Sequence, residues 1–224
     1  MKDRPPILLQ DLARIAAWLI SKPLWFLRFE GVGNIPPAQS GPLVIASNHQ
    51  TYIDPVWICI PMRRRFRFMA FDKAFGWPMV GWLIRQLGAF PVKHPIDHSP
   101  RVFKESLRSL RDGYSIVVFP EGAREFADGA FFDFKTGAAV IARRAGVPIL
   151  PVTISGANRV WPQGRKWPGL FRRVTITYHS PLHLNDSKSA EEWTALLRDI
   201  IRLDESRKAF IIRLKNHRNF TESL

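Results

Sequence analysis

The chain has 224 residues and a mass of 25.7 kDa, with 46% hydrophobic and 23% charged residues, a composition typical of one folded domain and not of a disordered chain. Cys59 is the only cysteine, which excludes an internal disulfide and a thiolate-rich zinc site. The formal net charge of +14 and the pI near 10.7 indicate an anionic partner, whether nucleic acid, a membrane surface or a phosphorylated substrate.

The first predicted element is an amphipathic helix over residues 7–20. Its apolar side chains recur at helical spacing, and they are Leu8, Leu12, Ile15 and Leu19. Pro23 is expected to end or kink this helix, and a second apolar piece follows it. The longest charge-free stretch is far shorter than the roughly 20 residues that span a bilayer, and no cleavage site of a secretory signal follows. The helix therefore either docks in a membrane interface or packs on the protein core.

Beyond a Pro/Gly-rich connection at 31–41, strands and helices alternate along the chain. Strands are predicted at 43–47, 66–70, 89–92, 115–119, 149–154 and 174–178. Helices are predicted at 55–60, 74–87, 100–111, 136–145 and 190–201, the last extending towards residue 215. Strands separated by helices of this length predict an α/β fold, with a mixed, mostly parallel sheet flanked by helices.

A histidine and a carboxylate follow the first of these strands. His49 comes two residues after the predicted strand 43–47, near the carboxyl end of a strand, where catalytic groups of open α/β sheets lie. Asp54 is followed by Pro55, the pattern of a helix N-cap with proline at the first helical position. A turn between the two residues lets the carboxylate reach the imidazole, which can then act as a general base. A purely structural pair, with Asp54 as a helix cap, is the alternative.

A second polar turn follows the apolar run 115–119 and presents Glu121, Gly122 and Arg124. Arginine offers a rigid fork of donors suited to phosphate, and Glu121 is expected to bind a substrate hydroxyl or the arginine itself. Alternatively, these charges simply pair in solvent. Gly137 lies near the start of the next helix, where exposed backbone N–H groups favour an anion.

Basic residues concentrate between Asp133 and Asp186, a span without an acidic side chain. Aromatic residues are interspersed among them, namely Trp161, Trp167 and Phe171. A second basic run covers residues 63–67. Both segments are predicted as contacts with an anionic membrane, with an ordinary solvated loop as the alternative for the second.

Four short blocks of the sequence resemble those of one family. Residues 48–54 resemble its His-x-x-x-x-Asp motif, and residues 119–124 resemble its FPEGTR block. Residues 88–94 and 147–152 resemble its second and fourth blocks. The family is that of the 1-acylglycerol-3-phosphate acyltransferases, and the four blocks occur in its order across about half the chain. Each block alone is degenerate, whereas the four together are specific.

The resemblance implies acyl transfer without a covalent enzyme intermediate. His49 would remove the proton from the free hydroxyl of a lysophospholipid as that oxygen attacks the acyl thioester, and Asp54 would orient the imidazole. Acyl-CoA or acyl carrier protein is the implied co-substrate, and neither a cofactor nor a metal is implied. Substrate binding is predicted for Asn48, Lys93, His94, Glu121, Gly122, Arg124 and Gly137. Among these, the resemblance implies that Lys93, Glu121 and Arg124 position the acceptor headgroup.

An enzyme that acts on a lipid substrate must bind a membrane surface, and the basic and apolar segments are candidates for this contact. Residues 1–30 are predicted to form N-terminal amphipathic helices that dock on an anionic membrane surface, and residues 31–224 to form a single catalytic domain. The expected location is monotopic, on the cytoplasmic face of the bacterial inner membrane. No nucleic-acid motif occurs, so no nucleic-acid partner is expected.

Two residues depart from the family pattern. His94 stands where the second block usually ends in an arginine that contacts the acceptor phosphate, and Lys93 beside it offers a charge without a bidentate fork. Ala123 replaces the threonine of the third block. These departures leave another lysolipid acceptor open. Two other classes also remain: a non-catalytic protein that binds membranes or nucleic acid by charge, and a hydrolase, which the absence of a Gly-x-Ser-x-Gly elbow disfavours.

Overall fold

The computed structural model describes residues 7–93, 100–124, 132–162 and 164–221, and their strands form one seven-stranded sheet in the order β1-β7-β6-β2-β5-β3-β4. The strands are β1 Arg28–Glu30, β2 Val44–Ser47, β3 Phe66–Phe71, β4 Ala89–Val92, β5 Ser115–Val118, β6 Ile149–Ser155 and β7 Thr175–Tyr178. Strands β4, β3, β5, β2 and β6 are parallel, whereas β7 is antiparallel to β6 and parallel to β1. The predicted mixed, mostly parallel sheet is confirmed, and β2 occupies its centre.

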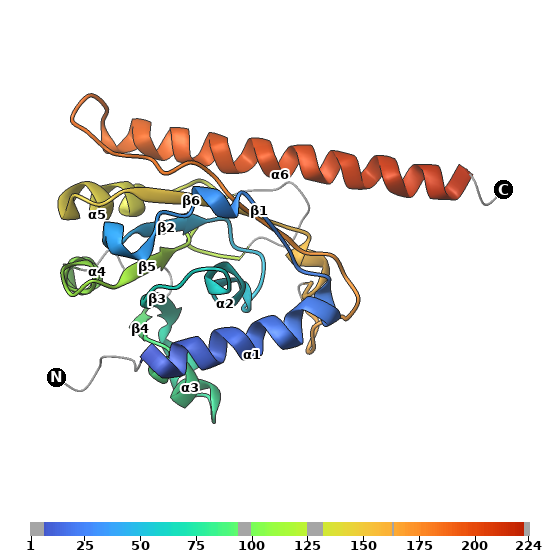
Figure 1. Cartoon of the computed structure of the whole chain (residues 1–224), viewed down its shortest axis with the longest axis horizontal. Coiled ribbons are helices and arrows are strands. Elements are labelled where there is room, and N and C mark those ends of the chain that lie inside the picture. The colour runs from blue at the N-terminus through green and yellow to red at the C-terminus, as the bar shows by residue number, and fades with distance from the viewer. Residues whose placement is uncertain (1–6, 94–99, 125–131, 163, 222–224) are drawn as a thin grey trace.

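Helices cover both faces of this sheet. They are α1 Ile7–Trp25, α2 Asp54–Cys59, α3 Val80–Gln86, α4 Pro100–Arg111, α5 Gly137–Ala145 and α6 Ala190–Thr221. Helices α1 and α2 pack on one face, and α4, α5 and α6 pack on the other. Figure 1 shows α6 extending well past the body of the protein. The α/β class predicted from the alternation of apolar segments is therefore correct.

The sheet separates two apolar cores. On the side of α1 and α2, the fully buried Trp57 meets Trp25 edge to face, with ring centroids 5.4 Å apart. On the other side, α4, α5 and α6 pack together on the sheet. Strand β2 alternates between the two cores, because Ile45 enters the first while Val44 and Ala46 enter the second, as expected for a strand covered on both faces. This double burial fixes the position of its carboxyl end.

The helix bounds near residues 23 and 78 differ from those predicted. The predicted helix at 74–87 is replaced by a 3₁₀ turn, Asp72–Gly76, and α3, because Pro78 lies between them and Met79 has φ 60°. Conversely, α1 does not end before Pro23 but continues to Trp25. The burial of Trp25 and Leu27 in the core holds this last turn in place despite the proline.

Strand β1 was missed because it has three residues, too few for an alternating pattern to stand out. It pairs in parallel with β7, with Phe29 opposite Ile176. The segment before residue 31 therefore contributes an edge strand to the sheet as well as a helix.

Helix α1 turns its polar side towards the protein. Gln10 donates to the carbonyl oxygens of Phe66 and Leu87 at 2.8 and 2.9 Å, and Arg14 donates to that of Met62. The predicted apolar stripe faces outward, with exposed fractions between 52% and 76% for Leu8, Leu12, Ile15 and Leu19. Within the described residues, every helix falls short of the length or apolar character needed to cross a membrane.

Candidate functional site

The carboxyl end of β2 is a point where connections leave the sheet in opposite directions. The chain after β2 enters α2 on one face, whereas the chain after the neighbouring β5 reaches α5 on the other. Ligands of open α/β sheets bind at such points. Asn48 extends β2 here, because its amide nitrogen donates to Ile154 O and its amide oxygen accepts from Ile154 N, both at 2.8 Å. Both polar atoms of the Asn48 side chain thus join β2 to β6.

The residues after Asn48 form a turn, residues 49–53, that we call the catalytic turn because it carries the predicted base His49. Asp54, at the first position of α2, is fully buried, and its carboxylate points back into this turn. It accepts from the Gln50 and Thr51 backbone N–H groups at 2.6 and 2.7 Å, from the Thr51 hydroxyl at 2.5 Å and from His49 Nδ1 at 3.0 Å. An ionised carboxylate has the acceptor capacity for these donors. The predicted N-cap role of Asp54 was wrong, because no side-chain cap bond forms at α2.

Three contacts fix His49 in one orientation. Its Nδ1 faces Asp54, its ring stacks on Phe119 with centroids 3.9 Å apart and planes 18° apart, and its backbone N–H donates to Glu121 Oε1 at 2.9 Å. The His49 side chain is 18% exposed. With Nδ1 bonded to the carboxylate, Nε2 carries the lone pair and is the nitrogen that can take a proton from a substrate.

Glu121 supports the catalytic turn from the neighbouring strand. It is 4% exposed, and its second oxygen accepts from the Phe132 backbone N–H at 3.4 Å. Gly122 follows in a turn with φ 74°, where its N–H donates to Phe119 O at 3.1 Å, a conformation that favours glycine. Glu121 therefore holds the backbone of His49, and its predicted contact with substrate stays a prediction.

Arg124 joins the same site from the turn after β5. Its guanidinium lies over the ring of Tyr52, 3.6 Å from the ring centroid. The structure thus brings together His49, Asp54, Glu121 and Arg124, although the second pair lies about seventy residues further along the chain. The reason is the direct pairing of β2 with β5, whose carboxyl ends lie at the same edge of the sheet.

Other predicted site residues lie further away or outside the described residues. Lys93 is exposed and directly follows β4, which is three strands from β2, or about 14 Å at roughly 4.8 Å per strand. His94 lies outside the described residues. Gly137 is exposed and is the first residue of α5. Substrate binding by these residues stays a prediction.

Sequence reasoning missed the partners that hold the catalytic turn. Gln50 is buried, and its amide nitrogen donates to Glu205 Oε1 of α6 at 2.8 Å, while its oxygen accepts from the backbone N–H groups of Ala157 and Asn158 at 3.0 and 3.3 Å. The Thr51 hydroxyl and the Phe119 ring were also missed. Gln50 and Thr51 lie in the block 48–54, and Phe119 lies in the block 119–124. These positions were the available signal, but a sequence motif does not show which residue each side chain contacts.

The arginine run at 63–67 is largely engaged in the fold. Arg64 donates to the carbonyl oxygens of Gly41, Pro36 and Pro37, and burial lowers the pKa of its guanidinium. Arg67 is 12% exposed and pairs with Glu105 of α4 at 3.0 Å. Arg64 and Arg67 are thus engaged in the fold, whereas Arg63 and Arg65 are exposed. The predicted membrane contact of the run stays a prediction.

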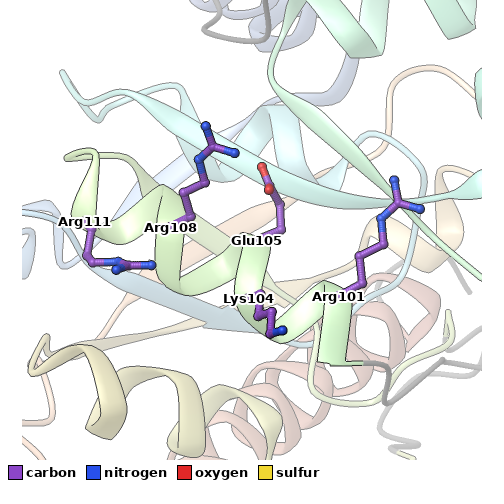
Figure 2. Close-up of a pocket in the computed structure, with 5 residues that line it drawn as sticks. All are labelled: Arg101, Lys104, Glu105, Arg108 and Arg111. Carbon is purple, nitrogen blue, oxygen red and sulfur yellow. The ribbon is translucent and has the colours of Figure 1, made fainter. Parts of the chain in front are cut away.

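A separate basic surface lies along α4. Figure 2 shows the side chains that line a hollow there, with three pointing to one side of the helix and two to the other: Arg101, Glu105 and Arg108, and Lys104 and Arg111. None of them belongs to the catalytic turn, and α4 packs on the opposite face of the sheet from α2. This hollow is therefore distinct from the site at the end of β2.

Cys59, the last residue of α2, is buried, and burial raises the pKa of its thiol far above the usual range. A thiolate nucleophile is therefore not available from this residue. Among residues 7–93, 100–124, 132–162 and 164–221, no three His, Cys, Asp or Glu side chains gather as ligands of one metal ion.

Comparisons with known proteins agree with this geometry. A family model described as Acyltransferase matches residues 27–155, more than half of the chain. The chain is 30% identical over 174 residues to a chloroplastic 1-acyl-sn-glycerol-3-phosphate acyltransferase of Arabidopsis thaliana, covering 77% of this chain and 48% of the relative. It is 32% identical over 167 residues to a 1-acyl-sn-glycerol-3-phosphate acyltransferase of Streptococcus pneumoniae, covering 70% of this chain and 56% of the relative.

The solved structures include a similar fold. The crystal structure of the 1-acyl-sn-glycerophosphate acyltransferase PlsC from Thermotoga maritima matches with a TM-score of 0.73 and 27% identity, covering 90% of this chain and 78% of that one. The chain spans about half the length of the curated relatives it matches.

Proposed function

The chain belongs to the acyltransferase family, and from that premise we propose that it transfers a fatty acyl group from acyl-CoA or acyl carrier protein to 1-acyl-sn-glycerol-3-phosphate, giving phosphatidic acid. The observation that carries the proposal is the bonded pair of His49 and the buried Asp54, with Arg124 beside the same turn. The relatives from Arabidopsis and Streptococcus are named for activity on the same acceptor, which favours this assignment.

The proposed reaction proceeds by direct attack of the acceptor hydroxyl. His49 Nε2 takes the hydroxyl proton while the oxygen bonds to the thioester carbonyl carbon, which forms a tetrahedral oxyanion. Collapse of this intermediate breaks the C–S bond, and the departing sulfur takes the proton from His49. Asp54 keeps the imidazole in the required tautomer and stabilises its protonated form. The two substrates supply all the atoms, so the enzyme ends each cycle unchanged.

Arg124 is proposed to bind the phosphate of the acceptor. Replacing it by alanine should raise the KM for 1-acyl-sn-glycerol-3-phosphate by about 10- to 100-fold, since a hydrogen bond to a charged group contributes about 1.5–3 kcal/mol. Arg124→Lys should recover part of this loss, because lysine keeps the charge but not the fork. Mass spectrometry of the products from a panel of lysolipids, each offered with both acyl donors, measures the effect.

Arg111→Ala is the matched control, because this arginine lies at the end of α4 in the separate basic hollow. Its KM should stay within about twofold of the wild-type value. If another lysolipid is acylated faster than the phosphate-bearing one, and Arg124→Ala leaves that ratio unchanged, the assignment of the acceptor is wrong. Because His94 stands where the family usually has an arginine that contacts the acceptor phosphate, the panel of lysolipids is the decisive test of the acceptor.

We further infer that the protein docks on one leaflet of an anionic membrane, at the cytoplasmic face of the bacterial inner membrane. The outward apolar stripe of α1 supports this inference, because its polar side is already bonded to the protein. Exposed apolar residues also lie in and before α3 and in the loop before β7, and they include Trp77, Met79, Trp82, Trp167, Leu170 and Phe171. The loop reaches α1, since the Phe171 N–H donates to Leu24 O and its ring meets Phe26.

Point substitutions test this docking more sharply than deletion of residues 1–30, which also removes β1 and the buried Trp25. Leu12→Ser combined with Leu19→Ser should lower partition onto vesicles with anionic lipid by about 10-fold or more, since a leucine that leaves water contributes on the order of 1 kcal/mol. Added salt should weaken binding of the wild type. Cosedimentation measures both effects.

Leu203→Ser is the matched control, because Leu203 is 72% exposed on α6, beyond the opposite face of the sheet. It should leave partition unchanged. Equal sedimentation of the α1 variant and the wild type would remove α1 from the docking surface.

A further inference from the structure

We propose that Tyr52 is a positioning residue that holds Arg124 in the orientation in which its guanidinium fork receives the acceptor phosphate. This inference rests on the proposed function of Arg124. Tyr52 lies inside the catalytic turn, between Thr51 and Ile53. The Thr51 hydroxyl donates to Asp54 and accepts from the Ile53 backbone N–H. The turn that holds the base would then also hold the phosphate-binding group, so both are placed by one segment of backbone.

Two tryptophan rings pack roughly perpendicular to the ring of Tyr52. Trp77 meets it at 81° with centroids 6.4 Å apart, and Trp161 meets it at 80° with centroids 5.4 Å apart. Both are edge-to-face contacts of the kind that aromatic pairs prefer. Trp161 is anchored in turn, because its indole N–H donates to Arg165 O at 2.9 Å. The Tyr52 ring therefore keeps a fixed plane although it stands at the surface.

The face of this ring is occupied by Arg124. The guanidinium carbon lies 3.6 Å from the ring centroid, which is van der Waals contact and well inside the range of a cation–π interaction. A planar guanidinium stacked on a ring keeps its N–H groups directed outward from its edges, where they can meet an anion. Stacking thus orders the long side chain of Arg124 before the acceptor arrives, which reduces the entropy lost on binding.

Packing in the core does not explain Tyr52. Its side chain is 53% exposed, in a turn whose neighbours Gln50, Thr51 and Asp54 are all buried. A proton relay through its hydroxyl is the competing explanation. The two roles differ in what they require: positioning requires the ring face, whereas a relay requires the hydroxyl.

Substitution of Tyr52 separates these roles. The probe is 1-hexanoylglycerol 3-phosphate, a soluble short-chain acceptor whose binding does not depend on membrane docking. Its dissociation constant is measured by calorimetry in the His49→Ala protein, in which turnover does not interfere. Tyr52→Leu should weaken binding by about 2- to 30-fold, whereas Tyr52→Phe should stay within about twofold.

A double-mutant cycle with Arg124→Ala tests whether Tyr52 acts through the arginine. In the Arg124→Ala background, Tyr52→Leu should cause no further weakening. The proposal is overturned if Tyr52→Leu binds as tightly as its parent, if its effect is equally large without Arg124, or if Tyr52→Phe is as weak as Tyr52→Leu. It also falls if Arg124→Ala alone leaves binding unchanged. Acylation of the same probe by the wild-type enzyme is a separate measurement and reports on the proposed function alone.

Discussion

His49→Ala is expected to lower kcat for acylation of 1-acyl-sn-glycerol-3-phosphate by about 10²- to 10⁴-fold, the range that a positioned general base contributes. The KM values should change less, because His49 is proposed to accept the proton in the transition state and not to contribute to binding of the substrate in the ground state. Steady-state kinetics of the purified variant, with mass spectrometry of the phosphatidic acid formed, gives both constants. Full activity would sink the proposed mechanism.

His183→Ala provides the matched control for this experiment. His183 is exposed and follows Leu182, which forms a bridge with Ile149. Ile149 begins β6, so His183 lies near the amino-terminal ends of the strands, whereas the catalytic turn follows the carboxyl end of β2. Removal of the His183 side chain should leave kcat within about twofold. Thermal unfolding of both variants distinguishes lost chemistry from lost fold, since His49→Ala also removes the ring that stacks on Phe119.

Asp54→Asn is the second change with a large expected effect, a fall in kcat of up to about 10⁴-fold, as seen when the orienting carboxylate of a hydrolase triad becomes an amide. The amide cannot stabilise a protonated imidazole, and its NH2 group can turn His49 to the wrong tautomer. The Asp54 carboxylate accepts from the backbone N–H groups of Gln50 and Thr51 and from the Thr51 hydroxyl, so the NH2 group of asparagine would face a donor and leave it without an acceptor. Unfolding should therefore become easier by about 1–3 kcal/mol.

Thr51→Val separates these two consequences of the Asp54 variant. It removes the hydroxyl that donates to Asp54 Oδ1 but keeps the carboxylate next to His49. A comparable loss of stability, by about 1–3 kcal/mol, should therefore come with a much smaller loss of kcat. If Thr51→Val and Asp54→Asn lose kcat equally, Asp54 acts by holding the turn and not by orienting the imidazole.

The sequence predicted six of the seven strands and the pairing of His49 with Asp54, because both depend on short-range patterns. An apolar run bounded by turn residues marks a buried strand, and a proline after Asp54 ends the turn that contains His49. The contacts that hold this turn depend instead on residues far along the chain. Asn48 bonds Ile154 across 106 positions, and Glu121 bonds the His49 backbone across 72. No local pattern encodes which distant segment supplies such a partner.

The orientation of α1 shows a different limit of sequence reasoning. The spacing of Leu8, Leu12, Ile15 and Leu19 correctly indicates a helix with one apolar side, but either side of such a helix can face a protein. The outcome depends on the carbonyl oxygens of Met62, Phe66 and Leu87, which receive the polar side chains of α1. Those carbonyls become neighbours of α1 only once the sheet has formed.

The bond between Gln50 and Glu205 has a consequence for the time course of biosynthesis. The two residues are 155 positions apart, so a ribosome adding about 5–20 residues per second reaches Glu205 roughly 8–30 s after it has incorporated Gln50. During that interval the nascent chain already contains His49 and Asp54 but lacks the carboxylate that receives the Gln50 amide. The catalytic turn is therefore completed late, when α6 closes over β6, and the order of translation delays the appearance of an intact site.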